Sequence, residues 1–587
     1  MLDPRIYRAA LLPVLLALIV VAFSLENRPP PLRTSLTPDA FDQVRASRLL
    51  ADLVRTYPER PAGSTADTEL AGRVASELRA ALPGVRVVRR VSSAPTPDGD
   101  RDLVTVLAQQ PGSAPLAQLV VVAARDATGR GGAAQLSGTA GMIELARVIA
   151  ATRPARSVTF ASVSGETGGQ GGMRELARLI GRPVDAVLEL GDLAGPVSDR
   201  LLVAPWSNGP GLAPMRLQRT VAFALRQEAQ VDAGVPFARA ELARFAWPWS
   251  PSGQGVLNED GLPAVRLSAS GEPPPAADAP ASADRLGAFG RSALRALSAL
   301  ETGPRVGDAP SRDLSVARKE LPGWAVRLLV FALLLPALLL TVDAVARARR
   351  RHERLTPSLG RVVIASIPFA LGALFARGLG LTGAVAATAP PPLPSAAPLD
   401  GSGWAAIGCT IAVVVLAALL LRPLTRQRAM PRGELAPSAP LAPLVVTCLV
   451  ALVAWAVNPY AAVLLVLPAN IWPLTATREA RVPPPVLVVL VLLSLVPVLL
   501  VIGSVAGQLG VAVTDAPWLV LLWLAGGQAG PLAIACCALT AGSATAVLRA
   551  AVRPRAASGP QGPITVRGPA SYAGPGSLGG TDSALRG

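Results

Sequence analysis

The second half of this chain is a series of long apolar runs, and these runs limit the folds that the chain can adopt. They lie near residues 324–345, 361–382, 404–421, 441–457, 459–475, 484–504 and 517–548. A further run, AALLPVLLALIVVAFSL, fills residues 9–25 and follows Arg5 and Arg8. Because about 20 apolar residues in a helix cross the hydrocarbon core of a bilayer, the sequence predicts eight membrane spans.

The connectors between these runs alternate in charge along the chain. RARRRHER (347–354), RPLTRQRAMPR (422–432) and RAAVRPR (549–555) are rich in arginine, whereas TAPPPLPSAAPLDGSG (388–403) holds no Arg or Lys. Basic connectors stay on the cytoplasmic side of a membrane. We therefore expect a multi-pass plasma-membrane protein with both termini in the cytoplasm. The segment between the run at 9–25 and the run at 324–345 should lie outside the cell.

The runs and connectors predict five regions. These are a cytoplasmic tip (1–8), a transmembrane anchor (9–25), an extracytoplasmic α/β domain (26–322), an all-α bundle of seven transmembrane helices (323–550) and a disordered cytoplasmic tail (551–587). A cleaved signal peptide is the alternative for the anchor, but SLENRPPP offers no small-residue cleavage site. The run 517–548 is either one kinked helix or begins with a re-entrant segment before its GGQAGP break.

Residues 38–302 alternate between short Val/Leu-rich runs and stretches with helical periodicity. The short runs are residues 85–91, 102–110, 117–126, 156–164, 185–190, 200–205 and 264–270. Strands that alternate with helices are typical of an α/β domain. The sequence thus predicts a mostly parallel mixed sheet flanked by helices.

The net charge of +16 would be compatible with nucleic-acid binding if the charge lay on a folded domain. Residues 26–322, however, hold 34 basic and 31 acidic residues, so nearly all of the excess lies beside the apolar runs. This distribution fits membrane topology. We expect no nucleic-acid partner.

Motifs in the α/β region follow one another in an order that resembles the family-28 zinc metallopeptidases of clan MH, the aminopeptidase-like group. RTYPERPAGSTADTELAGRVASELRA (55–80) is similar to that family's Pro-x-Arg-x-x-Gly-Ser stretch and first helix. VVVAARDATGRGGAAQLSGTAGMIELA (120–146) is similar to its unit of strand, His-x-Asp, loop, Gly-Ala-x-Asp-Asn-x-Ser-Gly and helix. GETGGQGG, DLAG and GLPAV follow in the family's order. The resemblance implies a zinc-aminopeptidase-like fold.

The resemblance also implies where two zinc ions would be held by imidazoles and carboxylates. The histidine of His-x-Asp falls on Ala124, and the Asp that supports it falls on Asp126. The metal-bridging Asp falls on Ala134, although Ser137-Gly138 after it are kept. Two of the family's ligand positions in this unit therefore carry alanine.

The later motifs continue this pattern. In the paired-glutamate motif the general base matches Glu166, while the zinc ligand beside it is Thr167. A fourth ligand would be Asp192 after a shift of one residue, and the last histidine falls on Gln254. The one histidine of the chain, His352, lies in a basic connector. We therefore predict no cofactor and no bound zinc, with Glu166, Asp126 and Asp192 as vestigial site residues.

These observations favour a catalytically inactive, peptidase-like domain that serves as a binding or assembly module. We expect its partners to be the lipid bilayer and a peptide, protein or lipid ligand in the former active-site cleft, at the carboxyl ends of the strands. The order of anchor, peptidase-like domain and bundle also resembles the attachment subunit of the GPI-transamidase complex and membrane-tethered aminopeptidases, in architecture only.

Two alternatives stay open. The first is a residual membrane-bound metallo(amino)peptidase or hydrolase that uses Glu166. The second is a transporter-like bundle with an accessory domain, against which the near absence of acidic residues in the apolar runs weighs. A serine hydrolase at Ser164 lacks a histidine base, and GRGGAAQ (129–135) lacks the lysine of a phosphate-binding loop.

Overall fold

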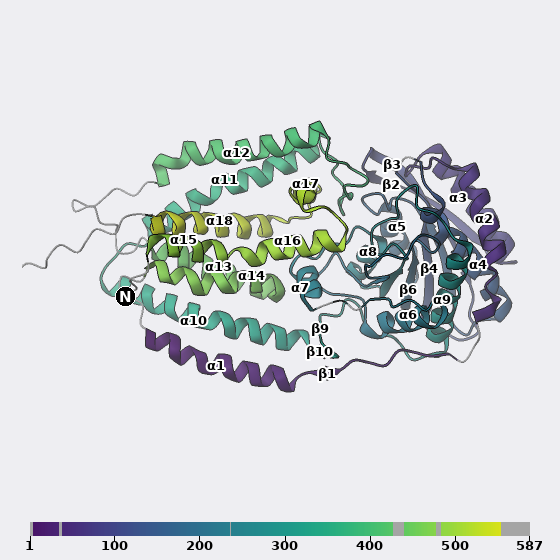
Figure 1. Cartoon of the computed structure of the whole chain (residues 1–587), viewed down its shortest axis with the longest axis horizontal. Coiled ribbons are helices and arrows are strands. Elements are labelled where there is room, and N and C mark those ends of the chain that lie inside the picture. Colours follow the sequence, from purple (N-terminus) through teal and green to yellow (C-terminus); the bar gives the residue numbers. More distant parts are fainter. Residues whose placement is uncertain are drawn as a thin grey trace, which may run out of the picture.

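The computed structural model describes residues 4–34, 38–128, 130–234, 236, 238–425, 440–476 and 483–552. Figure 1 shows an elongated molecule with an α/β domain at one end and long helices at the other. The predicted fold class is confirmed, because a mixed sheet flanked by helices stands beside a helical region with five candidate membrane spans. Most of the predicted tail lies outside the described residues, since α18 ends at Val552.

Seven strands form one sheet in the order β2-β3-β5-β4-β6-β8-β7. The strands are β2 (Val87–Thr96), β3 (Gly99–Gln110), β4 (Gln118–Ala124), β5 (Val158–Val163), β6 (Val184–Leu190), β7 (Val203–Ala204) and β8 (Ala264–Leu267). Each of the seven predicted runs overlaps one of them. The central strands β5, β4, β6 and β8 are parallel, while the pairs at both edges are antiparallel. The carboxyl ends of the central strands therefore meet at one edge of the sheet.

Helices cover both faces of this sheet (Figure 1). One face carries α2 (Gln43–Thr56), α3 (Thr65–Ala81), α4 (Ala133–Thr152), α6 (Met215–Glu228) and α9 (Ala283–Thr302), and the other carries α5 (Gly171–Leu179) and α8 (Gly253–Glu259). Side chains alternate between the faces of a strand. Val121 and Ala123 accordingly pack into the core of the first face, and Val120 and Val122 into that of the second. The sheet is thus buried on both sides, and its second face looks toward the helical region.

A small antiparallel sheet joins the two ends of the α/β domain. It contains β1 (Glu26–Asn27), β9 (Leu314–Val316) and β10 (Lys319–Leu321) in the order β1-β10-β9. β1 follows α1 (Pro4–Phe23), and β10 precedes α10 (Gly323–Arg350). The chain therefore enters and leaves the α/β domain at one place, next to two helices that pack against each other.

The helical region follows the predicted apolar runs. Its remaining helices are α11 (Thr356–Leu381), α12 (Gly401–Thr425), α13 (Leu441–Val457), α14 (Pro459–Ile471), α15 (Pro484–Leu493), α16 (Val496–Gln508), α17 (Ala516–Ala525) and α18 (Pro531–Val552). Shorter elements are the 3-10 turns η1 (Pro38–Ala40), η2 (Trp472–Ala476) and η3 (Val513–Asp515), and the helix α7 (Ala238–Ala246) of the α/β domain.

Five described helical stretches are long and apolar enough to cross a membrane. They are Gly323–Arg350, Thr356–Leu381, Gly401–Thr425, Pro485–Gln508 and Pro531–Arg549. Shorter apolar helices are Ala9–Phe23, Leu441–Val457, Pro459–Leu474 and Val513–Ala525. Apolar side chains also point away from the protein, as on α12, where Leu416 and Leu420 are 59% and 68% exposed. A surface of this kind suits contact with lipid.

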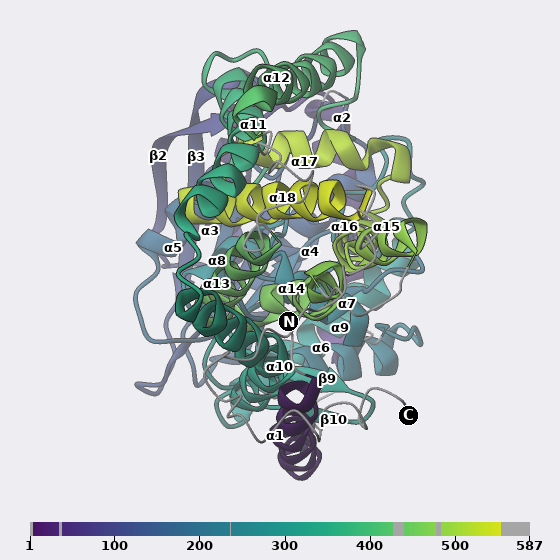
Figure 2. The same ribbon diagram turned by 90° about the vertical axis from the view of Figure 1, so that its left-hand side faces the viewer.

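The last apolar run, residues 517–548, is not one helix. It divides into α17 and α18, with a break at residues 526–530. In Figure 1 α17 is seen nearly end-on, whereas α18 is seen from the side. A helix of 10 residues is only about 15 Å long, so α17 alone is too short to cross a bilayer. Figure 2, which looks along the molecule, puts α1 and α12 at opposite edges of the region, and α17 packs against α11 and α12.

Candidate functional site

The residues singled out by the sequence meet where the parallel strands end. Asp126 follows β4, Glu166 lies in the turn after β5, and Asp192 follows β6. Gln254 lies at the start of α8, just before β8. The structure therefore brings the predicted positions together at the carboxyl edge of the sheet, on the side of α5 and α8.

Asp126 holds the turn that carries Glu166. Its Oδ1 accepts hydrogen bonds from the backbone N–H groups of Gly165 and Glu166 at 2.9 and 3.1 Å. Its Oδ2 accepts from the N–H and Oγ1 of Thr167 at 3.1 and 3.0 Å. Burial raises the pKa of Asp126 to about 6, with a smaller contribution from the carboxylates of Asp67 and Glu166. Four donors thus occupy this carboxylate, and Thr167 is one of its anchors.

Glu166 faces the guanidinium of Arg266, which comes from β8. The Nη1 atom of Arg266 forms an ion pair with Glu166 and a second one, at 2.6 Å, with Glu189 of β6. The side chain of Glu166 is 14% exposed, and those of Arg266 and Glu189 are 2% and 0% exposed. Burial raises the pKa of Glu166, and Arg266 opposes that shift.

Arg266 is a permanent cation at the centre of the site. Burial lowers its pKa, but the carboxylates of Glu166 and Glu189 raise it above the ordinary value, so the group stays charged. The guanidinium passes Gly191 so closely that a Cβ there would lie 2.8 Å from it. Glycine at this position therefore leaves room for the arginine.

Glu189 receives further donors from the start of α8. Its Oε2 accepts from the N–H of Gln254 at 2.6 Å, and its Oε1 from the N–H of Gly253 at 3.3 Å. The side chain of Gln254 donates to Oγ of Ser250 at 3.0 Å. Gln254 therefore takes part in a network of hydrogen bonds between β6, β8 and α8.

Asp192 closes the loop after β6. Its Oδ1 accepts from the N–H groups of Ala194 and Gly195 at 3.0 and 2.6 Å and from Oγ of Ser137 at 3.3 Å. Ser137 also donates to the carbonyl of Ala134 at 2.6 Å. Burial raises the pKa of Asp192, and these hydrogen bonds oppose the shift. Its Oδ2 is buried and has no hydrogen-bond partner among the described residues.

These residues do not fit a pair of zinc ions. Ala124 and Ala134 offer no side-chain ligand, and the hydroxyl of Thr167 is bound to Asp126. The charged guanidinium of Arg266 would repel a cation placed beside Glu166. No group of three or more His, Cys, Asp or Glu side chains able to hold a metal is found in the described part of the chain. His352 follows α10 at the end of that helix away from the α/β domain (Figure 1).

Two further arginines frame the site, and the sequence reading missed them along with Arg266. Arg60 is buried, and its guanidinium donates to the carbonyls of Arg125, Gly131 and Gly132 at 2.9, 3.1 and 3.2 Å. Arg125 pairs with Asp67 at 2.8 Å, and both side chains are fully buried. Burial lowers the pKa of Arg60 to about 10. These contacts fix the loop between β4 and α4.

A signal for Arg266 and Glu189 does exist in the sequence. Each is the only charged side chain near the end of an apolar strand, in AVRL (264–267) and in VLEL (187–190). An isolated charge in a buried strand needs a partner. Opposite charges in two such strands therefore indicate a buried pair if the strands are neighbours.

A loop from the helical region covers the turn of Glu166. The N–H of Gly169 donates to the carbonyl of Pro390 at 3.0 Å, and Arg174 of α5 donates to the carbonyl of Ala389 at 2.8 Å. Thr388 is fully buried in this contact. The connector between α11 and α12 thus lies directly on the segment that follows the candidate site.

A second contact between the two parts runs through α7 and the residues after it. Arg244 donates to Oε1 of Gln508 on α16 at 2.9 Å and pairs with Glu272 at 2.5 Å. Asn458, before α14, donates to the carbonyl of Phe245 at 2.7 Å. Phe245 stacks on Tyr460, with ring centroids 4.3 Å apart. The α/β domain and the helices therefore share buried, specific contacts.

Comparison with known proteins gives similar folds only among solved structures. No family model matches the chain, and no curated protein matches it. The chain is similar to a glutaminyl cyclase from an Acidobacteriales bacterium, with 16% identity over 47% of this chain and 97% of that chain and a TM-score of 0.35. It is also similar to LapB from Legionella pneumophila, with 16% identity, 48% and 79% coverage and a TM-score of 0.37.

A leucine aminopeptidase precursor from Bacteroides thetaiotaomicron gives 13% identity, 46% and 98% coverage and a TM-score of 0.34. The neighbours are thus glutaminyl cyclase and aminopeptidase folds. With identities and TM-scores as low as these, the activities of those proteins are not assigned to this chain.

Proposed function

We propose that this chain is a multi-pass membrane protein whose peptidase-like domain is catalytically inactive and serves as a binding or assembly module. The observation that carries the proposal is the buried guanidinium of Arg266 between Glu166 and Glu189. This fixed cation pairs with the residue at the general-base position, Glu166, and would repel a metal ion placed beside it.

The chemistry of Glu166 supports inactivity. A general base must accept a proton from a water or a substrate group at hydrogen-bond distance. Here the guanidinium of Arg266 is paired with Glu166 and occupies the carboxylate to which such a proton would have to be donated, although burial raises the pKa of Glu166. The family's ligand positions at Ala124, Ala134, Thr167 and Gln254 offer no replacement for a zinc site.

An assembly role is supported by the contacts between the α/β domain and the helices. The 388–390 segment covers the turn of Glu166, and Arg244 and Asn458 connect α7 to α16 and α14. We infer that the domain holds the helices in place and presents a surface to a partner. A peptide, protein or lipid ligand in the former cleft would have to bind beside the 388–390 segment.

For the membrane arrangement we propose eight spans, cytoplasmic termini and an extracytoplasmic α/β domain in the plasma membrane. The alternation of basic connectors supports it. Single cysteines at Asp98 and His352, both exposed, test it in a background without the four native cysteines. An impermeant maleimide should label the Asp98→Cys variant in intact cells and the His352→Cys variant only after lysis. The reverse pattern would invert the topology.

Metal analysis and activity assays of the full chain in detergent test inactivity. We expect less than one zinc per chain, no release of an N-terminal amino acid from peptides, and no cyclisation of an N-terminal glutamine. Arg266→Gln and Glu166→Gln should leave these results unchanged. About two zinc ions per chain, with an activity that Glu166→Gln abolishes, would support the residual hydrolase and refute the proposal.

The transporter alternative has a different signature. It requires that the purified chain carries a small solute across the membrane of reconstituted vesicles. Substitutions within the 323–550 helices should then abolish this transport. Retained transport in the absence of any binding partner would favour that alternative over a binding or assembly module.

A further inference from the structure

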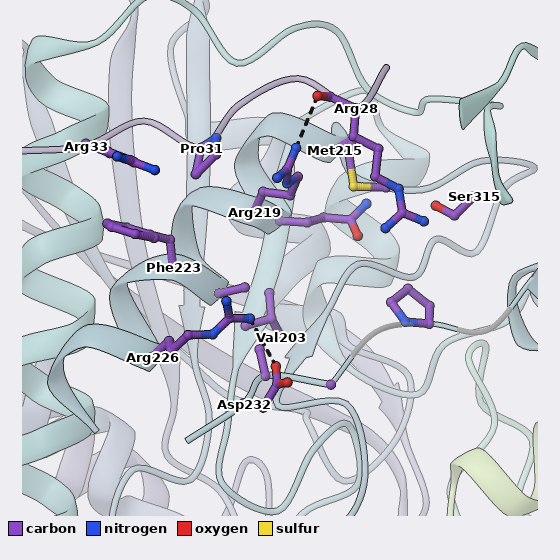
Figure 3. A pocket seen from close by; sticks show the side chains of 15 residues that line it. Arg28, Pro31, Arg33, Val203, Met215, Arg219, Phe223, Arg226, Asp232 and Ser315 are labelled. Atoms are coloured by element: carbon purple, nitrogen blue, oxygen red, sulfur yellow. Dashed lines mark hydrogen bonds and ion pairs between the residues drawn. The ribbon is translucent and has the colours of Figure 1, made fainter. Parts of the chain in front are cut away.

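A cavity of about 380 Å³ lies on the α/β domain, away from the candidate site (Figure 3). Its walls come from the segment after β1, from one face of α6 and from the loop that follows α6. Ser315 of β9 adds a further part of the wall. The volume is at the small end of the range for ligand sites, so it suits a compact polar group.

Arginines dominate the charge of this cavity. Arg28, Arg33, Arg219 and Arg226 line it, with Asp232 as the acidic member of the lining. Asp232 is already paired with Arg226 at 3.3 Å. Three guanidinium groups therefore face the cavity without a carboxylate from its own lining.

Arg28 is the arginine best placed to bind a ligand. Figure 3 shows its side chain extending past Met215 toward Ser315. Its Nε is buried and has no hydrogen-bond partner in the described parts of the chain. Glu241 and Glu320 lie near it. Burial raises the pKa of Glu241 to about 7 and also raises that of Glu320, and Arg28 opposes both shifts.

The other two arginines have contacts that hold them at the cavity. Arg219 donates from Nη1 to the carbonyls of Arg28 and Pro29 at 3.1 and 2.5 Å. Arg33 stands over the ring of Phe223, 5.0 Å from its centroid. Neither contact neutralises a guanidinium charge. The cavity thus combines fixed positive charge with a partly apolar wall.

The position of the cavity points to the membrane surface. Arg28 lies five residues after Phe23, where α1 ends, and Ser315 precedes α10 by a short turn and strand. Five residues extend at most about 18 Å. If α1 and α10 cross the membrane, the cavity opens close to the lipid headgroups.

We propose that this cavity binds a phosphate anion, supplied by the headgroup of an anionic phospholipid. Guanidinium groups bind phosphate oxygens through charge-assisted hydrogen bonds. Basic side chains at the membrane surface attract anionic lipids. The proposal depends on α1 and α10 spanning the membrane and not on the inactivity of the peptidase-like site, so either can fail without the other.

The test uses the full chain in a neutral detergent, with dioleoyl phosphatidylglycerol as the probe. Dioleoyl phosphatidylcholine and inorganic phosphate are the two comparison probes, and native mass spectrometry measures the affinity of each. We expect Arg28→Gln to weaken phosphatidylglycerol binding about fivefold and Arg28→Gln with Arg33→Gln to weaken it about 25-fold. Arg28→Lys, which keeps the charge, should lose less than Arg28→Gln.

Arg79→Gln is the matched control, because Arg79 is exposed on α3 at the far end of the α/β domain. It should leave lipid binding unchanged. Equal binding of phosphatidylcholine, or an unchanged affinity in the double variant, would overturn the proposal. Binding of inorganic phosphate without the phospholipid would overturn the lipid as the source. The melting temperature without lipid shows that each variant is folded.

Discussion

Arg266 on β8 and Glu189 on β6 stand side by side in the parallel register of the sheet, and their side chains form a buried ion pair at 2.6 Å. Both lie on the face covered by α5 and α8. Adjacent strands thus place opposite charges at the carboxyl edge, and the turn after β5 adds Glu166 to the same cation.

Replacing Arg266 by methionine should destabilise the α/β domain by about 3–5 kcal/mol, because two carboxylates would lose a buried partner. Thermal unfolding of the full chain in detergent measures the loss. Arg266→Met together with Glu189→Gln should be more stable than Arg266→Met alone, since one uncompensated charge is removed. A double variant as unstable as the sum of the two single variants would contradict the pairing.

The substitutions Asp126→Asn and Asp192→Asn should have different effects on the stability of the α/β domain. Asp126 accepts two hydrogen bonds on each oxygen, so an amide –NH₂ there would lose two of them, and we expect Asp126→Asn to cost about 2–3 kcal/mol. Oδ2 of Asp192 has no hydrogen-bond partner among the described residues, and Asp192→Asn should be close to neutral. Melting temperatures of the two variants check the difference. Equal losses would show that the hydrogen-bond assignment is wrong.

Glu241 should make the stability of the chain depend on pH. Burial raises its pKa from an ordinary value of 4.5 to about 7. The folded state therefore holds this proton more tightly than the unfolded state, and stability present below about pH 4.5 is lost as the pH rises through 7.

Glu241→Gln keeps an acceptor for the N–H of Ser315, which Glu241 now receives at 2.6 Å, and removes the charge. Above about pH 8 we expect a relative gain of about 3 kcal/mol for this variant. Melting temperatures at about pH 6 and about pH 8 would show a smaller decrease than in the parent chain. Asp126 titrates in the same direction between 3.8 and about 6, so the upper part of this range isolates Glu241. An unchanged slope would count against the pKa shift.

Asn458 should matter both for α14 and for the contact with α7. Its Oδ1 accepts from the N–H groups of Tyr460 and Ala461 at 3.1 and 3.4 Å, and its Nδ2 donates to Phe245. Asn458→Ala removes both functions and should cost about 1–2 kcal/mol. Asn458→Asp keeps the cap and loses the donor, so it should cost less than Asn458→Ala. Similar melting temperatures for these two variants would mean that capping contributes little.

The sequence predicts much of this fold because the patterns that define it are local. The apolar run at 441–457 and the next at 459–475 become α13 and α14, separated at Asn458. For the run at 517–548 the sequence permits either one kinked helix or a re-entrant start, because GGQAGP (526–531) is compatible with both. The structure interrupts the run at residues 526–530, where a Cβ on Gly526 would lie 2.3 Å from the carbonyl oxygen of Thr388.

The candidate site could be predicted only in part. Motif order predicts that Asp126, Glu166 and Asp192 meet, since each follows a strand of one parallel sheet. The role of Arg266 depends on β6 and β8 being neighbours, although residues 191–263 separate them in the chain. Pairing between segments so far apart leaves no local pattern, and the assignment of a partner to Glu166 had to come from the structure.

The small sheet of β1, β9 and β10 has a consequence for how the chain is built. Glu26 pairs with Glu320 and Asn27 with Lys319, so the first and last residues of the α/β domain lie next to each other. Topologically the domain is a cassette inserted between α1 and α10. A short linker from Asn27 to Lys319 could replace the cassette and leave those two helices joined as a hairpin, but the helices would then lose the contacts that Gln508 and Asn458 make with the domain.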